Sequence, residues 1–142
     1  VHDVLQNSFI KMFRSIESFE CRGDGSLRAW MTRIVVNESL KYIKQNTDFK
    51  LSLSESDIPD IVDEEEPNLE EIPQSKIMKM IRALPDGYRT VFNLYVFEEK
   101  SHKEIAAILG IAENSSASQF HRAKAMLVQK IKEYKMSKTA QL

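Results

Sequence analysis

The side chains best suited to covalent or metal chemistry are few in this sequence and lie far apart. The three histidines are His2, His102 and His121, and the one cysteine is Cys21. No nucleophile–base pair, glycine-rich phosphate loop or cluster of metal ligands accompanies them. We therefore expect a protein that is not an enzyme and holds no metal or other cofactor. A hydrolase or transferase activity of the purified protein would overturn this expectation.

Basic side chains gather near the end of the chain, where they could contact phosphate groups. After residue 114 a single acid, Glu133, is opposed by six bases: Arg122, Lys124, Lys130, Lys132, Lys135 and Lys138. Such a run suits the charged backbone of a nucleic acid. The alternative is that these side chains only form the solvated face of a helix.

The net charge of −1 conceals three segments of different charge. Residues 1–46 hold seven Lys/Arg and five acids, residues 47–75 hold one Lys and ten acids, and residues 76–142 hold twelve bases and six acids. Pro59, Pro67 and Pro73 interrupt helices in the acidic middle. We therefore predict a linker over 47–75 between helical domains at 1–46 and 76–138.

Composition favours helices throughout. With 142 residues, four Gly and four Pro, the chain has room for two small helical domains rather than a turn-rich β-sandwich. No apolar run approaches the roughly 20 residues that span a membrane, so no membrane insertion is expected. The lone Cys21 fits a reducing cytoplasm. We predict an all-α fold.

The first segment is predicted to form two helices. Apolar spacing predicts one over about Asp3 to Phe19, with Asp3 as a candidate N-cap. Two glycines in three residues make Glu20 to Ser26 a loop. A second helix is predicted over Ser26 to Gln45. Apolar positions in the two helices are Val4, Leu5, Phe9, Met12, Phe13 and Ile16, then Leu27, Trp30, Met31, Ile34, Val35 and Tyr42.

Four helices are predicted after the linker. They cover about Gln74–Leu84, Asp86–Phe97, Ser101–Leu109 and Glu113–Lys135. The residues expected to point inward from the second and fourth of these are Tyr88, Val91, Phe92, Tyr95, Phe120, Ala123, Leu127, Ile131 and Tyr134.

The stretch from Ser101 to Ile111 has the spacing of a helix-turn-helix. Ser101 and Glu104 form a capping box, Ala106 allows two helices to cross closely, and Gly110 can take the positive φ of a tight turn. The following helix could then lie in a major groove. The alternative is an ordinary pair of packed helices.

Two sets of motifs resemble the sigma-70 family of transcription factors. Leu84 to Tyr95, Ser101 to Ile111 and His121 to Lys124 resemble region 4 of that family. Asp3 to Phe9, Phe19 to Asp24 and Trp30 to Asn37 resemble region 2. No helical domain separates the two, a layout similar to that of the extracytoplasmic-function (ECF) group. The resemblance implies a cytoplasmic factor that binds core RNA polymerase and directs promoter recognition, DNA melting and transcription initiation.

The resemblance also implies particular contacts in the first domain. Asp3 and Gln6 would bind the β′ subunit of the polymerase, although Asp3 could instead only cap its helix. The loop from Phe19 would capture a base flipped out of the −10 element, with Asn37 lining the pocket. Trp30 is expected to pack in the core rather than stack on bases. The implied −10 contacts are Phe19, Arg22, Arg28, Arg33, Asn37 and Lys41.

The second domain would contact the −35 element, and the β subunit of the polymerase is a further implied partner. Arg122 could bond to a guanine or to a phosphate, and both alternatives stay open. Ala117 stands where the family usually has a basic residue, and Ser116 where it commonly has an apolar one. The implied −35 contacts are Asn114, Ser115, Ala117, Ser118, His121, Arg122 and Lys124.

Three further expectations follow from the resemblance. An anti-sigma factor is an expected partner. Relatives carry another helix before Asp3, so the first domain should expose apolar surface. The acidic linker would imitate a nucleic acid in the channel that RNA later occupies, or else serve as a solubilising spacer.

Two rival functions remain at this point. A self-sufficient helix-turn-helix repressor would dimerise on a palindromic operator, and would leave the first domain's motifs unexplained. An adaptor that binds polymerase with weakened promoter specificity would fit the departure at Ala117.

Overall fold

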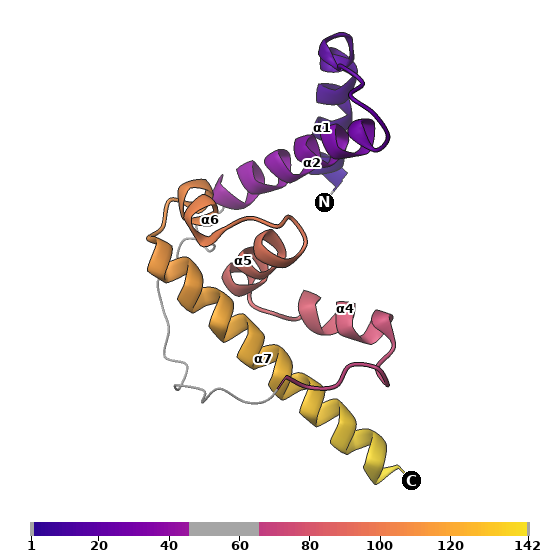
Figure 1. Ribbon diagram of the computed structural model, residues 1–142, viewed down its shortest axis with the longest axis vertical. Helices are drawn as coiled ribbons and strands as arrows, with labels where there is room; N and C mark the ends of the chain where they lie inside the picture. Colours follow the sequence, from indigo (N-terminus) through magenta and orange to yellow (C-terminus); the bar gives the residue numbers. More distant parts are fainter. Residues whose placement is uncertain (1, 46–65, 142) are drawn as a thin grey trace. The chain divides into compact units, whose positions relative to one another are not determined.

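The computed structural model describes residues 2–45 and 66–141 (Figure 1). Every regular element in these two ranges is a helix, which confirms the predicted all-α fold. The chain divides into two compact units, Val1–Asp48 and Phe49–Leu142, called unit 1 and unit 2 below. The greater part of the predicted linker, residues 47–65, lies outside the described residues.

Unit 1 consists of two α-helices joined by a short 3-10 helix and a loop. The elements are α1 (His2–Ser15), η1 (Ile16–Ser18) and α2 (Ser26–Gln45), and α1 packs against α2. The prediction for α2 is confirmed at both ends. Gly23 and Gly25 have φ values of 119° and 81° in the loop, a region open to glycine because it has no Cβ.

The first helix differs from its prediction at both ends. It ends at Ser15, where the chain tightens into η1. The Ser15 hydroxyl donates to the carbonyl of Lys11 at 2.6 Å, and the Ser18 hydroxyl donates to that of Ser15 at 2.7 Å. Serine side chains compete in this way for the carbonyls that continue a helix. Asp3 lies within the first turn of α1, so its predicted role as N-cap is wrong.

Much of the apolar side of α1 is exposed. Met12 is buried, whereas Leu5, Phe9 and Phe13 are exposed, Phe13 to 77%. This confirms the expectation of exposed apolar surface in the first domain. Next to Met12 in sequence, Lys11 forms an ion pair with the buried carboxylate of Glu38 on α2.

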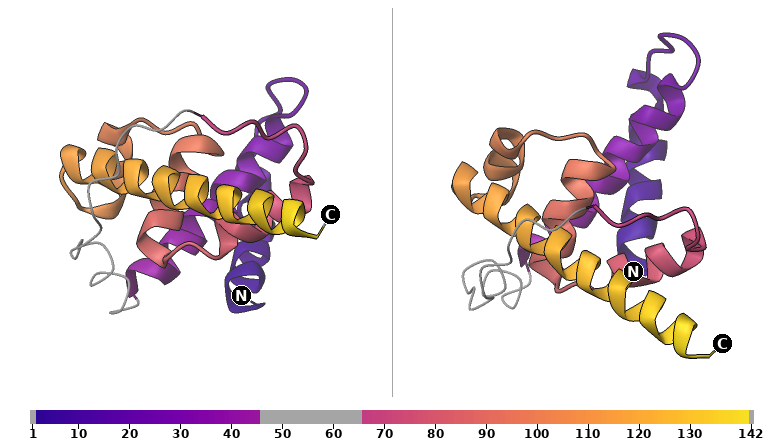
Figure 2. Two further views of the ribbon diagram at one scale, coloured as in Figure 1. Left: turned by 90° about the horizontal axis from the view of Figure 1, so that it is seen from below. Right: turned by 60° about the horizontal axis from the view of Figure 1, so that its bottom comes forward.

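Within residues 66–141, unit 2 contains four α-helices, all close to their predicted positions. They are α4 (Gln74–Arg82), α5 (Asp86–Val96), α6 (His102–Leu109) and α7 (Glu113–Ala140). Helix α7 runs the length of the unit, with α6 beside its N-terminal end (Figures 1 and 2). It extends five residues past the predicted end at Lys135, because no Gly or Pro stops it.

The core of unit 2 is formed where α7 packs on α4, α5 and α6. Val91, Ile105 and Ala123 are fully buried. A cluster joins α4 and α5 to α7, and its buried members are Ile81, Leu84, Tyr88, Ala123 and Leu127.

Tyr95 is the clearest error among the residues predicted to point inward. It is 39% exposed, and its ring stacks on His102 with centroids 4.6 Å apart. The ring of Phe120 lies 4.3 Å from it. Ser116 and Gln119 of α7 are buried, so polar residues take interior places that apolar spacing did not predict.

The turn between α6 and α7 has the predicted chemistry. Ser101 caps α6, its hydroxyl accepting from the Glu104 amide at 3.2 Å while Glu104 accepts from the Ser101 amide at 2.8 Å. Gly110 ends the helix with φ 68°. Ala106 and Leu109 are buried. The predicted capping box, small contact residue and left-handed turn are all confirmed.

Candidate nucleic-acid interface

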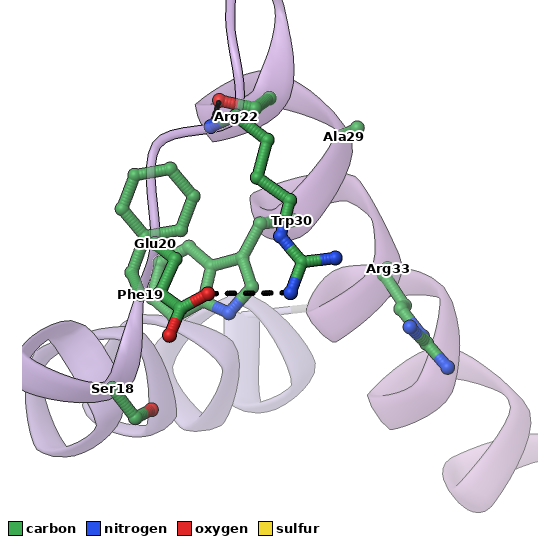
Figure 3. A pocket seen from close by; sticks show the side chains of 8 residues that line it. Ser18, Phe19, Glu20, Arg22, Ala29, Trp30 and Arg33 are labelled. Carbon is green, nitrogen blue, oxygen red and sulfur yellow. Dashed lines mark hydrogen bonds and ion pairs between the residues drawn. The ribbon is translucent and has the colours of Figure 1, made fainter.

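Unit 1 has an open cavity of about 550 Å³ between its loop and the start of α2. Figure 3 shows the side chains that line it. They are Ser18, Phe19, Glu20, Arg22, Ser26, Ala29, Trp30 and Arg33. Three of the predicted −10 contacts, Phe19, Arg22 and Arg33, are thus brought to one place from the loop and from α2.

Two aromatic rings form one side of this cavity. The rings of Phe19 and Trp30 are tilted by 45°, with centroids 5.2 Å apart. Both side chains are half-buried, so each has one covered and one accessible part. The expectation that Trp30 packs in the core is therefore correct only in part, because the same ring also lines the cavity.

Charged groups complete the lining. The Arg22 guanidinium donates to the Glu20 carboxylate at 3.2 Å, and both side chains are largely exposed. Figure 3 draws this pair, with Arg33 further along α2. Glu20 was not among the predicted contacts. The sequence places Glu20 directly after Phe19, but an acidic residue beside a glycine-containing loop is not a pattern that predicts a contact.

The remaining predicted contacts of α2 divide between two sides of the helix. Arg33, Asn37 and Lys41 recur every four residues, so they share one side, and all three are exposed. Arg28 is also exposed but projects from the opposite side, since nine residues separate it from Asn37 and each residue turns the helix by about 100°. Asn37 lies outside the cavity lining, contrary to expectation.

Cys21 lies in the loop beside the cavity and is exposed. Hydrogen bonding to the backbone of Gly23, and then to the Ser26 hydroxyl at 3.6 Å, lowers the pKa of its thiol below the ordinary value. The Ser26 hydroxyl also accepts from the backbone amide of Arg22 at 3.3 Å. These bonds tie the loop to the first residue of α2.

Asp3 and Gln6 form a separate pair on α1. Both are exposed, and a spacing of three residues places them on one side of the helix. They contribute nothing to the cavity lining.

The predicted −35 contacts occupy one half of α7. Arg122 is half-buried and the other six are exposed. At about 100° per residue, the seven side chains cover the half of the helix opposite to its buried residues Ser116, Ala123 and Leu127. The full set is Asn114, Ser115, Ala117, Ser118, His121, Arg122 and Lys124.

Two contacts join α7 to other parts of unit 2 near the predicted −35 residues. Ser116 is fully buried, and its hydroxyl lies 3.0 Å from Nδ1 of His102, at the start of α6. Lys124 forms an ion pair at 3.1 Å with Glu66, which precedes α4. The departure at Ser116 is thus accounted for by a hydrogen bond within the turn motif.

Comparison with known proteins identifies both units. Residues 1–48 match the family model described as Sigma-70 region 2, and residues 74–127 match the one described as Sigma-70, region 4. The ECF RNA polymerase sigma-E factor of Haemophilus influenzae is 30% identical over 147 residues, covering 92% of this chain and 74% of the relative. The chain belongs to the ECF sigma factors.

Other ECF sigma factors show the same relationship. The sigma-E factor of Escherichia coli K12 is 28% identical over 142 residues, which cover 92% of this chain and 73% of that protein. The factor SigE of Mycolicibacterium smegmatis is 28% identical over 130 residues, or 88% of this chain and 49% of that protein.

The protein is therefore an RNA polymerase sigma factor that directs promoter-specific initiation. Members of this family bind core polymerase and promoter DNA, and they are non-catalytic initiation factors. The rival interpretation as a self-sufficient repressor is wrong, because both sigma regions are present in order.

Within 2–45 and 66–141, no three His, Cys, Asp or Glu side chains gather where they could hold a metal ion. In the same ranges no helix combines the length and apolar character needed to cross a membrane.

Proposed function

We propose that the cavity of unit 1 holds an unpaired base of the −10 element and that α7 reads the −35 element. The observation that carries the first part is the pairing of Phe19 and Trp30, 5.2 Å apart, beside Arg22 and Arg33 in one open cavity. Aromatic faces stack on bases of any sequence, and guanidinium groups neutralise the phosphates between them.

One side of α2 supports a path for the separated DNA strand, because it carries Arg33, Asn37 and Lys41. Arg33 lines the cavity, and Lys41 continues the same side two turns later in the helix. Asn37 lies between them and can both donate and accept a hydrogen bond. Arg28 is on the other side, so it would contact a different part of the DNA.

The exposed half of α7 supports the proposed −35 contacts. Ser115 and Ser118 lie near its N-terminus, where backbone amides and the helix dipole favour anions. Arg122 and His121 follow one turn later. The turn at Gly110 ends α6, and α7 then carries Ser115, Ser118 and His121 on an exposed side, as a recognition helix requires.

Membership of the family supports a proposal about the protein partners. We assign core polymerase binding to Asp3 and Gln6 against the β′ subunit, with further contacts to the β subunit. Residues 1–46 and 76–138 would be the two functional domains, with 47–75 as the linker. An anti-sigma factor is the further partner, and the factor acts in the cytoplasm without catalysing a reaction.

Removing one ring of the aromatic pair tests the cavity. Holoenzyme containing Trp30→Ala should form open complexes on the DNA upstream of the factor's own gene about 5- to 150-fold below wild type, because stacking on one base contributes about 1–3 kcal/mol. Permanganate reactivity of unpaired thymines measures the open complex, and gel filtration measures holoenzyme assembly.

Tyr42 supplies the control for that experiment. It is an exposed aromatic residue of the same helix outside the cavity lining, so Tyr42→Ala should open DNA within about twofold of wild type. Phe19→Leu keeps the size of the side chain and should still lose activity. Normal opening by both Trp30→Ala and Phe19→Leu would contradict the proposed base site.

A second experiment addresses α7. Arg122→Ala is compared with Lys138→Ala, which removes the same charge from the exposed far end of the helix. Arg122→Ala should weaken promoter binding by the holoenzyme. If Arg122 contacts a phosphate, the affinity should fall by a similar factor on all promoter sequences. If it contacts a guanine, the preference for that base pair should be lost. Equal effects of the two variants would contradict the assignment.

A further inference from the structure

The end of the acidic linker lies on the basic side of α7. The Lys124 ammonium donates to the Glu66 carboxylate at 3.1 Å, and the Lys135 ammonium donates to the backbone carbonyl of Asn68 at 2.6 Å. Figure 1 shows the segment before α4 starting beside α7. Residues 66–72, called the strap below, thus hold two of the basic side chains of that helix.

The strap has a defined path and an anchored end. The Glu70 amide donates to the Asn68 side chain at 2.9 Å, and the Ile72 amide donates to the Leu69 carbonyl at 3.0 Å. Ile72 is buried, and the next residue begins the hydrogen bonding of α4. Burial of Ile72 anchors one end of the strap, and the bond from Lys135 to Asn68 holds its middle close to α7.

The lysines that the strap contacts belong to the side of α7 adjoining its proposed DNA surface. Lys124 is a member of the proposed −35 set, and Lys135 follows it by eleven residues. Eleven residues make roughly three turns, so both ammonium groups project from the same side. A phosphate that approached Lys124 would meet the carboxylate of Glu66 at the same position.

We propose that the strap is an internal competitor for promoter DNA, in which Glu66 occupies Lys124 until a DNA phosphate replaces it. The proposal rests on the proposed −35 role of α7. Glu66 repels phosphates and also neutralises Lys124, one of the cations that would attract them. The sigma factor would therefore bind DNA more weakly than its basic helix alone permits.

The expected effect is modest because the pair is open to water. The side chains of Lys124 and Glu66 are 48% and 83% exposed, and exposed pairs change an equilibrium about two- to fivefold. The effect should also decrease with salt, since ions screen exposed charges.

The test compares the affinity of full-length variants for DNA. A short labelled duplex of mixed sequence is the probe, and its fluorescence anisotropy is followed at low ionic strength. Glu66→Gln should tighten binding about two- to fivefold. The control is Glu71→Gln, which removes the same charge from an exposed residue of the strap that forms no ion pair within 66–141. Its effect should be clearly smaller.

A double variant separates local masking from a general change in charge. In a Lys124→Gln background, Glu66→Gln should bring only the small gain seen with Glu71→Gln. An equal gain from Glu66→Gln and Glu71→Gln, or an undiminished gain from Glu66→Gln without Lys124, would overturn the proposal. Arg122→Ala reports on the α7 surface independently: if it weakens binding while Glu66→Gln changes nothing, the strap proposal fails and the −35 surface stands. If Arg122→Ala weakens binding neither to this duplex nor to any promoter sequence, the proposed function of α7 fails.

Discussion

Polar residues at single positions decide how the helix-turn-helix is held together. Ser116 is buried where the family commonly has an apolar residue, and its hydroxyl is paired with Nδ1 of His102 at 3.0 Å. A buried hydroxyl without a partner would cost free energy, so this bond permits a small polar residue at the crossing of α6 and α7. Ser116 is therefore compatible with the helix-turn-helix, whose capping box and left-handed turn are both present.

At the same scale, the capping box makes stability depend on pH. Hydrogen bonds from the Ser101 backbone and hydroxyl, and the nearby charge of Lys100, lower the pKa of Glu104 below its ordinary value of 4.5. A carboxylate whose pKa is lowered on folding stabilises the protein above its unfolded pKa. That contribution is lost as the pH falls through the folded pKa.

We therefore expect the difference in melting temperature between wild type and Glu104→Gln to have its full size at neutral pH. The difference should vanish in acid, below the lowered pKa of Glu104. Thermal unfolding followed by circular dichroism across this pH range measures it. Glu71→Gln, at an exposed carboxylate outside any helix, should show a smaller and flatter difference. A difference for Glu104→Gln that is constant with pH would contradict the capping role.

Among the elements, α1 combines a buried and an exposed apolar side. Met12 is 7% exposed and Phe13, the next residue, is 77% exposed. Successive helical residues point about 100° apart, so one faces α2 and the other faces solvent. The apolar character of Phe13 therefore contributes little to the folding of unit 1.

Substitution of these two residues should change the free energy of unfolding to very different extents. Phe13→Ser is expected to change the free energy of unfolding by less than about 0.5 kcal/mol and to reduce self-association, measured by light scattering. Met12→Ala should cost about 2–5 kcal/mol, because it leaves a cavity. A large loss of stability from Phe13→Ser in urea unfolding would show that its ring is covered in solution.

The whole chain consists of two units with separate interiors. Met12 and Leu40 are buried in unit 1, whereas Val91 and Ile105 are buried in unit 2. Each unit matches its own family region. The sigma factor should accordingly unfold in two transitions rather than one.

Ile105→Ala tests this independence. The residue is fully buried, so the variant should destabilise unit 2 by about 2–5 kcal/mol while the calorimetric transition of unit 1 stays in place. Leu40→Ala should shift only the other transition. Concerted movement of both transitions in either variant would indicate a shared cooperative unit.

Features that depend on neighbouring residues in the chain were predictable from the sequence alone. The bounds of α2, the capping box at Ser101 and the left-handed turn at Gly110 all follow from local spacing and backbone preference. The helical period would also have placed Arg28 apart from Asn37. The segregation of charge and the two sets of family motifs could likewise be recognised in the sequence, because neither depends on how the helices pack.

The tertiary structure alone decided which distant side chains meet. It brought Trp30 against Phe19 and placed Glu20 in the same cavity, and it paired Glu66 with Lys124 across 58 positions of the chain. Apolar spacing gives the side of a helix but not the partner that covers it, which is why Tyr95 and Phe13 could not be placed in advance. Such contacts arise from the packing of whole helices, and no short stretch of residues determines them.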